Sequence, residues 1–480
     1  MNKAITKLLT CIFVFISSFL SAQDYSKDVK MGDRAAKQVE AEMDFYKHDS
    51  LERLIQGIGK KLVNALEKKP TQFEFTFHLV DMEEPNAFAL PGGHIYVTRG
   101  ILPLIQNEDE LAGIIGHEIM HVIQRHSVKQ FNREIVPAVL KVPGNIINAI
   151  TFSRLGNLIN VPIDIIASPF IAKYSRKHEK EADDLGIALA ARAGYNPIKL
   201  ADVLERLSKE IEVFTGKAEK RNFLSDHPYT PFRSEDIRKL SKTLVPAKST
   251  PVASSQDNFI QKFNGLCFGH NPKNGVFVDT LFVQPELGVS MIMPSGWAKE
   301  NGRSQVTANH KDKDAALALS VASDSLNLKQ CVEQIQKKLK QSKSANLAFS
   351  GDTTLHGLPA YIMRVTNTKK GQEIILELIW VEYKNIVYQL EGVCINGKRK
   401  ATAEALRSFK PMTANERNLV MIYELQVVRS QNNESIEDLS KRTNNKLNSD
   451  LTLLFNDLDK KTPLPGDKPV KIIKKAPYNP

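Results

Sequence analysis

The spacing of apolar residues in the first half of the chain predicts helices packed around a small sheet. Apolar positions recur every three or four residues where a helix buries one face, and alternate with polar ones where a strand is half buried. Asn107 followed by Glu110 is typical of a helix start, and Pro91-Gly92-Gly93 of a turn between strands. The predicted elements are a helical pattern over 25–66, strands over 73–80 and 94–98, and helices over 108–125 and 175–193.

The stretch 127–173 is apolar but repeatedly broken by proline and glycine. Lys141, Arg154 and Asp164 interrupt each apolar run before it is long enough to cross a bilayer, which argues against a transmembrane hairpin. We expect lid or flap segments here. An ordinary buried pair of helices is the alternative.

The second half of the chain has the pattern of an α+β protein with an antiparallel sheet. Residues 244–258 are rich in Pro and Ser and have no periodicity, which is typical of a linker. Strand-like segments then recur up to 393, and 422–475 reads as strand, helix, helix and strand. The overall prediction is an α+β chain: a mainly helical domain with a small sheet, then an α+β domain, then a compact C-terminal module. The predicted boundaries are 1–22 for a signal peptide, 23–243, 244–258 for the linker, 259–413 and 414–480.

The N-terminus has the plan of a secretory signal peptide. Lys3 and Lys7 precede an apolar run over 8–20, and the small pair Ser21-Ala22 follows it, so cleavage is expected after Ala22. The run is short for an uncleaved membrane anchor, which is the alternative. The signal predicts export, with the periplasm of a Gram-negative bacterium as the expected location and an extracellular one left open.

Composition and charge exclude some classes of function. Loss of Lys3 and Lys7 with the signal lowers the formal charge from +11 to +9, and no long block of like charge indicates a nucleic-acid partner. Mild attraction to anionic envelope surfaces, and so peripheral membrane contact, is the most that the charge predicts. Cys267, Cys331 and Cys394 remain, all in the second half of the chain, and they allow at most one disulfide.

The segment His117-Glu118-Ile119-Met120-His121 lies in the helix expected over 108–125. Residues four apart project from one face of a helix, so His117 and His121 can direct ring nitrogens at one zinc ion while Glu118 reaches its water. Zinc lowers the pKa of that water, and Glu118 as general base can take the proton and return it to the leaving amine. Chance motifs on amphipathic helices, with surface histidines, are the alternative.

A catalytic zinc site also needs a third protein ligand. In the helix expected over 175–193, Glu179 and Asp183 are four apart on one face, so Glu179 can bind zinc while Asp183 hydrogen-bonds one of the ligands. The alternative is a charged, solvated start of a helix. Such a set favours one Zn²⁺ per chain, although other divalent metals can occupy similar sites in vitro.

Four separate blocks of the sequence also occur together in one known family. They are Asn86-Ala-Phe-Ala-Leu-Pro91-Gly92-Gly93-His-Ile-Tyr-Val, Glu110-Leu-Ala-Gly-Ile-Ile-Gly-His117-Glu118-Ile-Met-His121, Glu179-Lys-Glu-Ala182-Asp183, and Ser225-Asp226-His227-Pro228 with Arg233. Over roughly 24–242 the chain resembles the zinc endopeptidases of the CAAX prenyl endopeptidase and HtpX family, and among them the periplasmic, BepA-like members.

The resemblance implies roles for residues outside the helical motif. Glu179 rather than Glu181 would be the third zinc ligand. His227 would lie near the zinc, where it either steadies the negative charge that develops on the substrate or occupies the open coordination position as a reversible latch. Arg233 would brace it.

The resemblance also implies a place for the substrate. The strand that follows Pro91-Gly92-Gly93 would be the sheet edge on which a peptide lies as an added strand, with Asn86 in the same block. His94 is interpreted as a strand residue and His126 as a polar residue at the helix end, neither of them a ligand.

The C-terminal half resembles extensions found in secreted members of this family. Segments around Phe263, Trp297 and Phe409 are similar to PsbP-like α/β folds, and no catalysis is assigned to them. The tail from Ser435 resembles a LysM module, a fold that in other proteins holds peptidoglycan. It has Asn433-Glu434-Ser435 where Gly-Asp-Thr is expected, so binding of peptidoglycan by this module stays an open expectation.

Three functional hypotheses follow. The leading one is a secreted zinc metalloendopeptidase that hydrolyses misfolded or stalled envelope proteins. The second is a chaperone-like assembly factor whose protease is normally latched by His227. The third is a cell-wall-anchored binding protein that acts through its tail.

Overall fold

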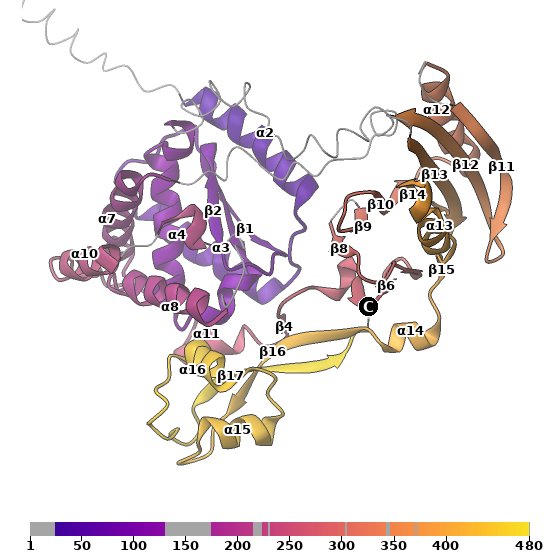
Figure 1. Cartoon of the computed structure of the whole chain (residues 1–480). Helices are drawn as coiled ribbons and strands as arrows, with labels where there is room; N and C mark the ends of the chain where they lie inside the picture. Colours follow the sequence, from indigo (N-terminus) through magenta and orange to yellow (C-terminus); the bar gives the residue numbers. More distant parts are fainter. Residues whose placement is uncertain are drawn as a thin grey trace, which may run out of the picture. The chain divides into compact units, whose positions relative to one another are not determined.

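The computed structural model describes residues 25–129, 174–214, 223–228, 231–302, 305–341, 346–369 and 372–479. These form two compact units. The first consists of the described residues up to 129, those between 174 and 263, and 453–459, and the second of those over 264–452 and 460–479 (Figure 1). The expected signal peptide and nearly all of the expected lid segments lie outside the described residues.

The first unit is mainly helical with one small sheet. Its elements are α2 (Ser26–Glu42), α3 (Asp49–Asn64), β1 (Thr76–Val80), β2 (Ala87–Leu90), β3 (His94–Thr98), α4 (Glu108–Ile123), α7 (Arg176–Arg192), α8 (Lys199–Phe214), α9 (Phe223–Asp226), α10 (Pro231–Ser241) and α11 (Gln256–Gln261), with short 3-10 turns at Pro91–Gly93 and Arg99–Leu104.

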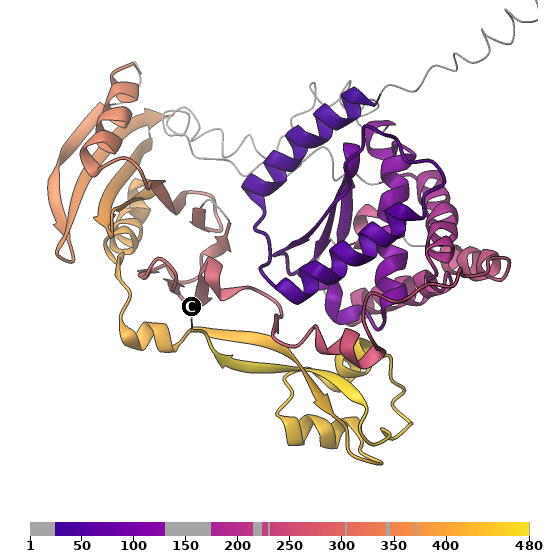
Figure 2. The same cartoon turned by 180° about the vertical axis from the view of Figure 1, so that it is seen from behind.

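The helical pattern expected over 25–66 forms two helices, α2 and α3. The chain between them runs along β1: Phe45 forms a bridge with Val80, and the Tyr46 amide donates to the Leu79 carbonyl at 2.8 Å. This connection covers the outer edge of β1. Figure 2 shows α2 beside the sheet.

The sheet has the strand order β1-β3-β2, with β3 parallel to β1 and antiparallel to β2. The expectation that the strand after Pro91-Gly92-Gly93 forms the sheet edge is therefore wrong, because β3 is hydrogen-bonded on both sides. The turn is also covered: a Cβ on Gly92 would lie 3.0 Å from Val29 Cα in α2, and one on Gly93 would lie 2.9 Å from the Glu74 carbonyl oxygen. β1 and β2 are the end strands of this sheet; the Phe45–Tyr46 segment covers the outer side of β1, and among the described residues no strand pairs with the outer side of β2.

The helices α4 and α7 cross at two glycines. A Cβ on Gly116 would lie 3.1 Å from the Gly186 carbonyl oxygen, and one on Gly186 would lie 3.0 Å from the backbone N and Cα of His117. No other residue allows so close an approach of two backbones. The crossing brings the His-Glu-x-x-His motif of α4 against the acidic residues of α7.

The segment 244–258 lies along the first unit. The amides of Val252 and Ala253 donate to the two carboxylate oxygens of Glu108 at 2.8 and 2.7 Å, and the Lys61 ammonium donates to the Thr250 carbonyl at 2.8 Å. Glu108 is the first residue of α4, and Lys61 lies in α3. The domain boundaries proposed from the sequence stay predictions.

The second unit is built from antiparallel sheets. Its strands and main helices are β4 (Leu266–Cys267), β5 (Val276–Val278), β6 (Leu281–Gln284), β7 (Val289–Ile292), β8 (Ala298–Asn301), β9 (Gln305–Asn309), β10 (Ala315–Ser323), α12 (Leu328–Gln341), β11 (Asn346–Leu355), β12 (Leu358–Lys369), β13 (Gln372–Tyr383), β14 (Ile386–Ile395), α13 (Arg399–Arg407), β15 (Lys410–Pro411), α14 (Ala414–Asn418), β16 (Met421–Arg429), α15 (Ile436–Thr443) and β17 (Pro469–Pro477). The helix α16 (Ser449–Asn456) begins in this unit, and its residues from Leu453 onward belong to the first.

The largest sheet has the order β11-β12-β13-β14-β10-β9-β8 and is covered on both faces. Alternate residues of β13 point to opposite sides: Leu378 and Trp380 pack with α12, whereas Ile379 and Val381 share a core with Leu406 of α13. The expected α+β architecture with an antiparallel sheet is confirmed. The expected order of strand, helix, helix and strand in the tail is also confirmed, as β16, α15, α16 and β17.

Cys267, Cys331 and Cys394 are buried free thiols, so none of them forms the disulfide that the sequence allowed. Among the described residues, no helix combines the length and apolar character that a membrane crossing requires.

Candidate metal centre

The two helices that carry most of the site, α4 and α7, each begin at a capping side chain. The Asn107 side chain caps α4 by accepting from the Glu110 amide at 3.0 Å, and Ser175 caps α7 by accepting from the His178 amide at 3.2 Å. The start of α4 was expected from Asn107 and Glu110, whereas the Ser175 cap of α7 was not assigned from the sequence. Each cap satisfies a backbone N–H group in the first turn of its helix.

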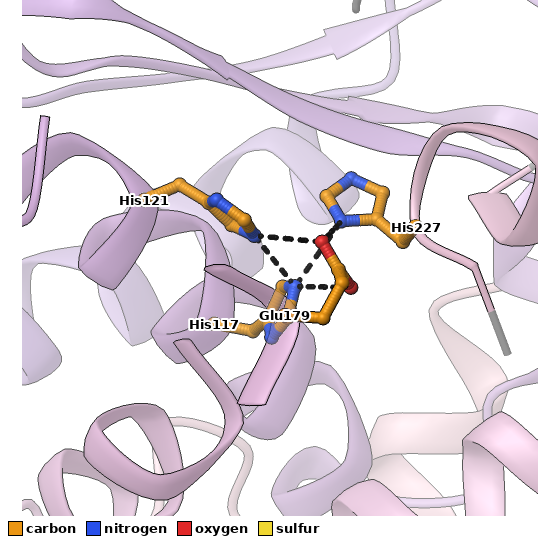
Figure 3. A group of neighbouring side chains, drawn as sticks. All are labelled: His117, His121, Glu179 and His227. Atoms are coloured by element: carbon orange, nitrogen blue, oxygen red, sulfur yellow. Dashed lines mark hydrogen bonds and ion pairs between the residues drawn. The ribbon is translucent and has the colours of Figure 1, made fainter. Parts of the chain in front are cut away.

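His117, His121, Glu179 and His227 point their ligand atoms at one another (Figure 3). His117 Nε2 lies 2.9 Å from His121 Nε2 and 3.6 Å from Glu179 Oε2, and His121 Nε2 lies 3.4 Å from Glu179 Oε1. His227 Nδ1 lies 3.2 Å from both His117 Nε2 and Glu179 Oε1. All four residues are buried.

This donor set fits a zinc ion. Zinc binds imidazole nitrogen and carboxylate oxygen at about 2.0–2.2 Å in a tetrahedron, whose edges are then about 3.3 Å long. The observed separations between 2.9 and 3.6 Å scatter around that edge. Burial lowers the pKa of His121 well below its ordinary value, so its ring is neutral, as a metal ligand must be. The expected ligands His117, His121 and Glu179 are brought together.

Asp183 and Arg233 contact the expected ligands His117 and Glu179. Asp183 Oδ1 lies 2.9 Å from His117 Nδ1, and Arg233 donates to both Asp183 oxygens at 2.8 Å. Arg233 Nη1 also lies 2.8 Å from Glu179 Oε2 and donates to the His227 carbonyl at 3.1 Å. Burial raises the pKa of Asp183, but Arg233 and His117 outweigh burial and hold that pKa below its ordinary value. Asp183 is therefore an anion that orients His117.

Glu118 is fully buried on the adjoining side of α4. Neither of its carboxylate oxygens has a hydrogen-bond partner among the described residues, and Oε1 lies 3.4 Å from His227 Nε2. Burial raises the pKa of Glu118, against the opposite effect of His227 and His117. A carboxylate in this environment can both accept and give up a proton, as a general base that later acts as an acid must.

The His227 segment is joined to the block that includes Asn86. The Asn86 side chain donates to Asp226 Oδ2 at 2.9 Å, and the Phe223 amide donates to the Pro85 carbonyl at 2.7 Å. Asn86, expected near the substrate, thus holds the turn that carries His227. Burial lowers the pKa of His227, but Glu179 and Glu118 outweigh it and raise that pKa to about 9.

Two aromatic residues that the sequence did not assign to the site contact His121. The Tyr174 ring stacks on the His121 ring with centroids 3.9 Å apart, and its hydroxyl is 2.7 Å from Ser127 Oγ. His126, interpreted from the sequence as a polar residue at the helix end, has Nδ1 3.0 Å from His121 Nδ1. No spacing in the sequence pointed to His126, because α4 ends at Ile123 and Arg125 turns the chain in a left-handed conformation before it.

A second group with metal-ligand chemistry lies in the turn between β9 and β10, formed by His310, Asp312 and Asp314. His310 Nδ1 contacts Asp314 at 2.5 Å, and the Lys398 ammonium lies 3.3 Å from His310 Nε2. An ammonium beside the ring disfavours a cation. We assign no metal to this group.

The fold and the site of the first unit thus define a metallopeptidase domain of the His-Glu-x-x-His type. Comparison with known proteins agrees: residues 49–241 match the model of peptidase family M48 and form a domain of that family. The family expected from the sequence is confirmed, and the chain carries a metalloendopeptidase domain.

The chain is also similar to curated proteases. The chain is 26% identical over 293 residues to the beta-barrel assembly-enhancing protease of Escherichia coli (strain K12), with 60% of this chain and 56% of that protein covered. It is 28% identical over 220 residues to the mitochondrial metalloendopeptidase OMA1 of Saccharomyces cerevisiae, with 44% of this chain and 61% of that protein covered. The chain therefore spans little more than half the length of these relatives.

Solved structures cover smaller shares of the chain. The solution structure of cyanobacterial PsbP from Synechocystis sp. PCC 6803 covers 28% of this chain and 95% of its own, at 12% identity and a TM-score of 0.22. The PsbP-like fold of the middle region and the LysM-like nature of the tail stay predictions.

Proposed function

We propose that this protein is an exported zinc metalloendopeptidase that hydrolyses peptide bonds of misfolded or stalled envelope proteins. The observation that carries the proposal is the convergence of His117 Nε2, His121 Nε2 and a Glu179 oxygen at tetrahedral spacing beside the buried Glu118. A bound zinc ion supplies Lewis acidity and lowers the pKa of water.

The chain's own residues divide the remaining work. Glu118 takes a proton from the attacking water and delivers it to the leaving amine, and its burial keeps its pKa high enough for both steps. Asp183 and Arg233 keep His117 and Glu179 in place. The fully enclosed position of these groups excludes bulk water, which strengthens each electrostatic contact.

We further propose that His227 acts as a latch. Its Nδ1 stands at tetrahedral spacing from His117 Nε2 and Glu179 Oε1, as a fourth ligand would, and its Nε2 is 3.4 Å from the general base Glu118. A side chain in that position competes with substrate for the metal and for Glu118. Access for a peptide then requires movement of the turn that Asn86 and Arg233 hold.

For the substrate, we propose that an extended peptide adds to the side of β2 that lacks a strand partner among the described residues, which must first become accessible because all four residues of β2 are buried. Within the described residues this side has no strand partner, whereas β3 is paired on both sides. Backbone pairing reads no particular side chain, which suits an enzyme that acts on many misfolded chains. The relation to a beta-barrel assembly-enhancing protease supports envelope proteins as the substrate class and the periplasm as the location.

The test is cleavage of casein by the purified protein with bound metal measured, comparing wild type with Glu118→Gln, His227→Ala and the control Glu404→Gln, which changes a carboxylate on the surface of α13. The proposal predicts about one zinc per chain, cleavage lost in Glu118→Gln and kept in the control. A latch predicts faster cleavage by His227→Ala, whereas slower cleavage would favour a role in stabilising charge on the substrate.

The chaperone-like hypothesis is supported by the same latched position of His227, since a protease held closed can still bind client proteins. It predicts that cells carrying Glu118→Gln keep the protein's biological role although cleavage is lost. Binding of peptidoglycan by 414–480 is a separate proposal, which a pull-down of the whole chain on purified peptidoglycan, with and without those residues, decides.

A further inference from the structure

His126 and Glu181 form a chain of polar contacts that ends at a proposed zinc ligand. His126 Nδ1 lies 3.0 Å from His121 Nδ1, and His126 Nε2 lies 3.3 Å from Glu181 Oε2. Both histidine rings are completely buried, while the Glu181 side chain is 38% exposed. The contacts therefore run from the ligand to the surface of α7.

A left-handed residue after the end of α4 turns the backbone so that His126 contacts His121. Helix α4 ends at Ile123, and Arg125 adopts φ +59°, a left-handed conformation that a side chain with a Cβ rarely takes. Asp28 of α2, itself buried, accepts from Arg125 Nε and Nη2 at 2.6 and 2.7 Å and holds this residue. Because the strained residue is fixed by a buried ion pair, the turn is maintained by the fold.

Only one arrangement of protons suits all these contacts when His121 binds a metal. Coordination through Nε2 leaves the proton of a neutral imidazole on Nδ1, so His121 Nδ1–H donates. His126 Nδ1 must then accept, which leaves its proton on Nε2, from where it donates to Glu181 Oε2. Every ring nitrogen has one role and one partner.

We propose that His126 is a positioning residue for the zinc site: it accepts the hydrogen bond from His121 and so fixes the tautomer and orientation of that ligand, with Glu181 anchoring His126 in turn. The proposal rests on the zinc site put forward above. It makes the two histidine ligands different, because His117 Nδ1 meets the carboxylate of Asp183 directly at 2.9 Å, whereas His121 reaches a carboxylate only through a second imidazole.

Packing alone does not explain His126. Its ring stacks on His178 with centroids 4.4 Å apart and an angle of 13° between the planes, so a flat apolar side chain would serve that contact as well. A hydrogen-bond acceptor 3.0 Å from the ligand's Nδ1 is what such a side chain would lack.

The experiment measures the dissociation constant of zinc for the full chain by competition with a chromogenic chelator, together with the thermal unfolding midpoint of the metal-free protein. His126→Asn and His126→Leu are compared because the two side chains have nearly the same shape, and the Asn amide oxygen replaces the acceptor at Nδ1. His126→Leu is expected to weaken zinc binding about 10–100-fold, as loss of such a partner does elsewhere. His126→Asn keeps the acceptor but loses the Nε2 contact with Glu181, so it should weaken zinc binding no more than Glu181→Ala does and clearly less than His126→Leu.

Equal zinc affinity of the Asn and Leu variants would overturn the proposal. Glu181→Ala changes a side chain that is 38% exposed, and it tests the same contact if His126→Leu does not fold. It should weaken zinc by about threefold or more, and an unchanged dissociation constant would count against the relay. If wild type itself bound no zinc, the proposed function would fail, which is a different outcome from wild type and His126→Leu binding equally well.

Discussion

The crossing of α4 and α7 offers a sharp test of how the site is assembled. A Cβ on Gly186 would lie 3.0 Å from the N and Cα of His117, both backbone atoms that cannot rotate away. Since carbon atoms rest at about 3.5 Å or more, Gly186→Ala must push the helices apart by about 0.5 Å at this point. Ligand geometry tolerates only about that much displacement.

The same substitution has a small effect on stability. Crowding a packed interface costs about 1–3 kcal/mol, and replacing glycine by alanine in a helix returns about 1 kcal/mol. Metal-free Gly186→Ala should therefore remain folded. Because Glu179 and Asp183 lie on the displaced helix, we expect zinc to bind at least about tenfold more weakly.

The assay is the zinc dissociation constant, with thermal unfolding of the metal-free form as the check on folding. Gly113→Ala is the matched control: it lies on α4, but its Cβ would meet the Leu200 side chain of α8 at 3.1 Å rather than α7. It should bind zinc as wild type does. If Gly186→Ala also bound zinc like wild type, the close crossing would not be what sets the ligand geometry.

Three further predictions concern the same unit. Arg206 and Glu110 form a buried ion pair at 2.8 Å, and Arg206→Ala, which strands the carboxylate, should destabilise the unit by about 3–5 kcal/mol in urea unfolding; a loss under about 1 kcal/mol would contradict the pairing. Chelation should lower the thermal midpoint of the first unit, and added zinc should restore it, since the ligand stabilises only the folded state. Because Arg233 and His117 hold the pKa of Asp183 below 3.8 despite burial, its stabilisation is present above that pH and is lost as pH falls further. Acid titration of Asp183→Asn should therefore show a shallower fall in stability below about pH 4 than wild type, and identical curves would refute this assignment.

The parts of the site that follow helical periodicity were predictable from the sequence. His117 and His121, like Glu179 and Asp183, are four residues apart, and the helix repeat alone puts each pair on one face. His227 was different, because nothing local marks a histidine before Pro228 as part of a site; only the family resemblance pointed to it. His126 was passed over because it follows a left-handed residue, Arg125, and helical spacing no longer applies there.

Strand order was harder to predict than strand position. The strand over 94–98 was located correctly, but whether it was an edge depended on its pairing with two strands, β1 and β2. β2 has four buried residues in a row and so lacks the alternation that predicts a strand. β11 was missed for the opposite reason, since it is exposed over much of its length as an edge strand.

The central claim is a zinc ion held by His117, His121 and Glu179, and X-ray absorption at the zinc edge of the purified protein tests it most directly. The account predicts about one zinc per chain, with imidazole nitrogen and carboxylate oxygen at about 2.0–2.2 Å and no sulfur. The Glu179→Ala variant should lose the metal or one oxygen ligand. Zinc bound through sulfur at about 2.3 Å, or a spectrum that Glu179→Ala leaves unchanged, would contradict the site.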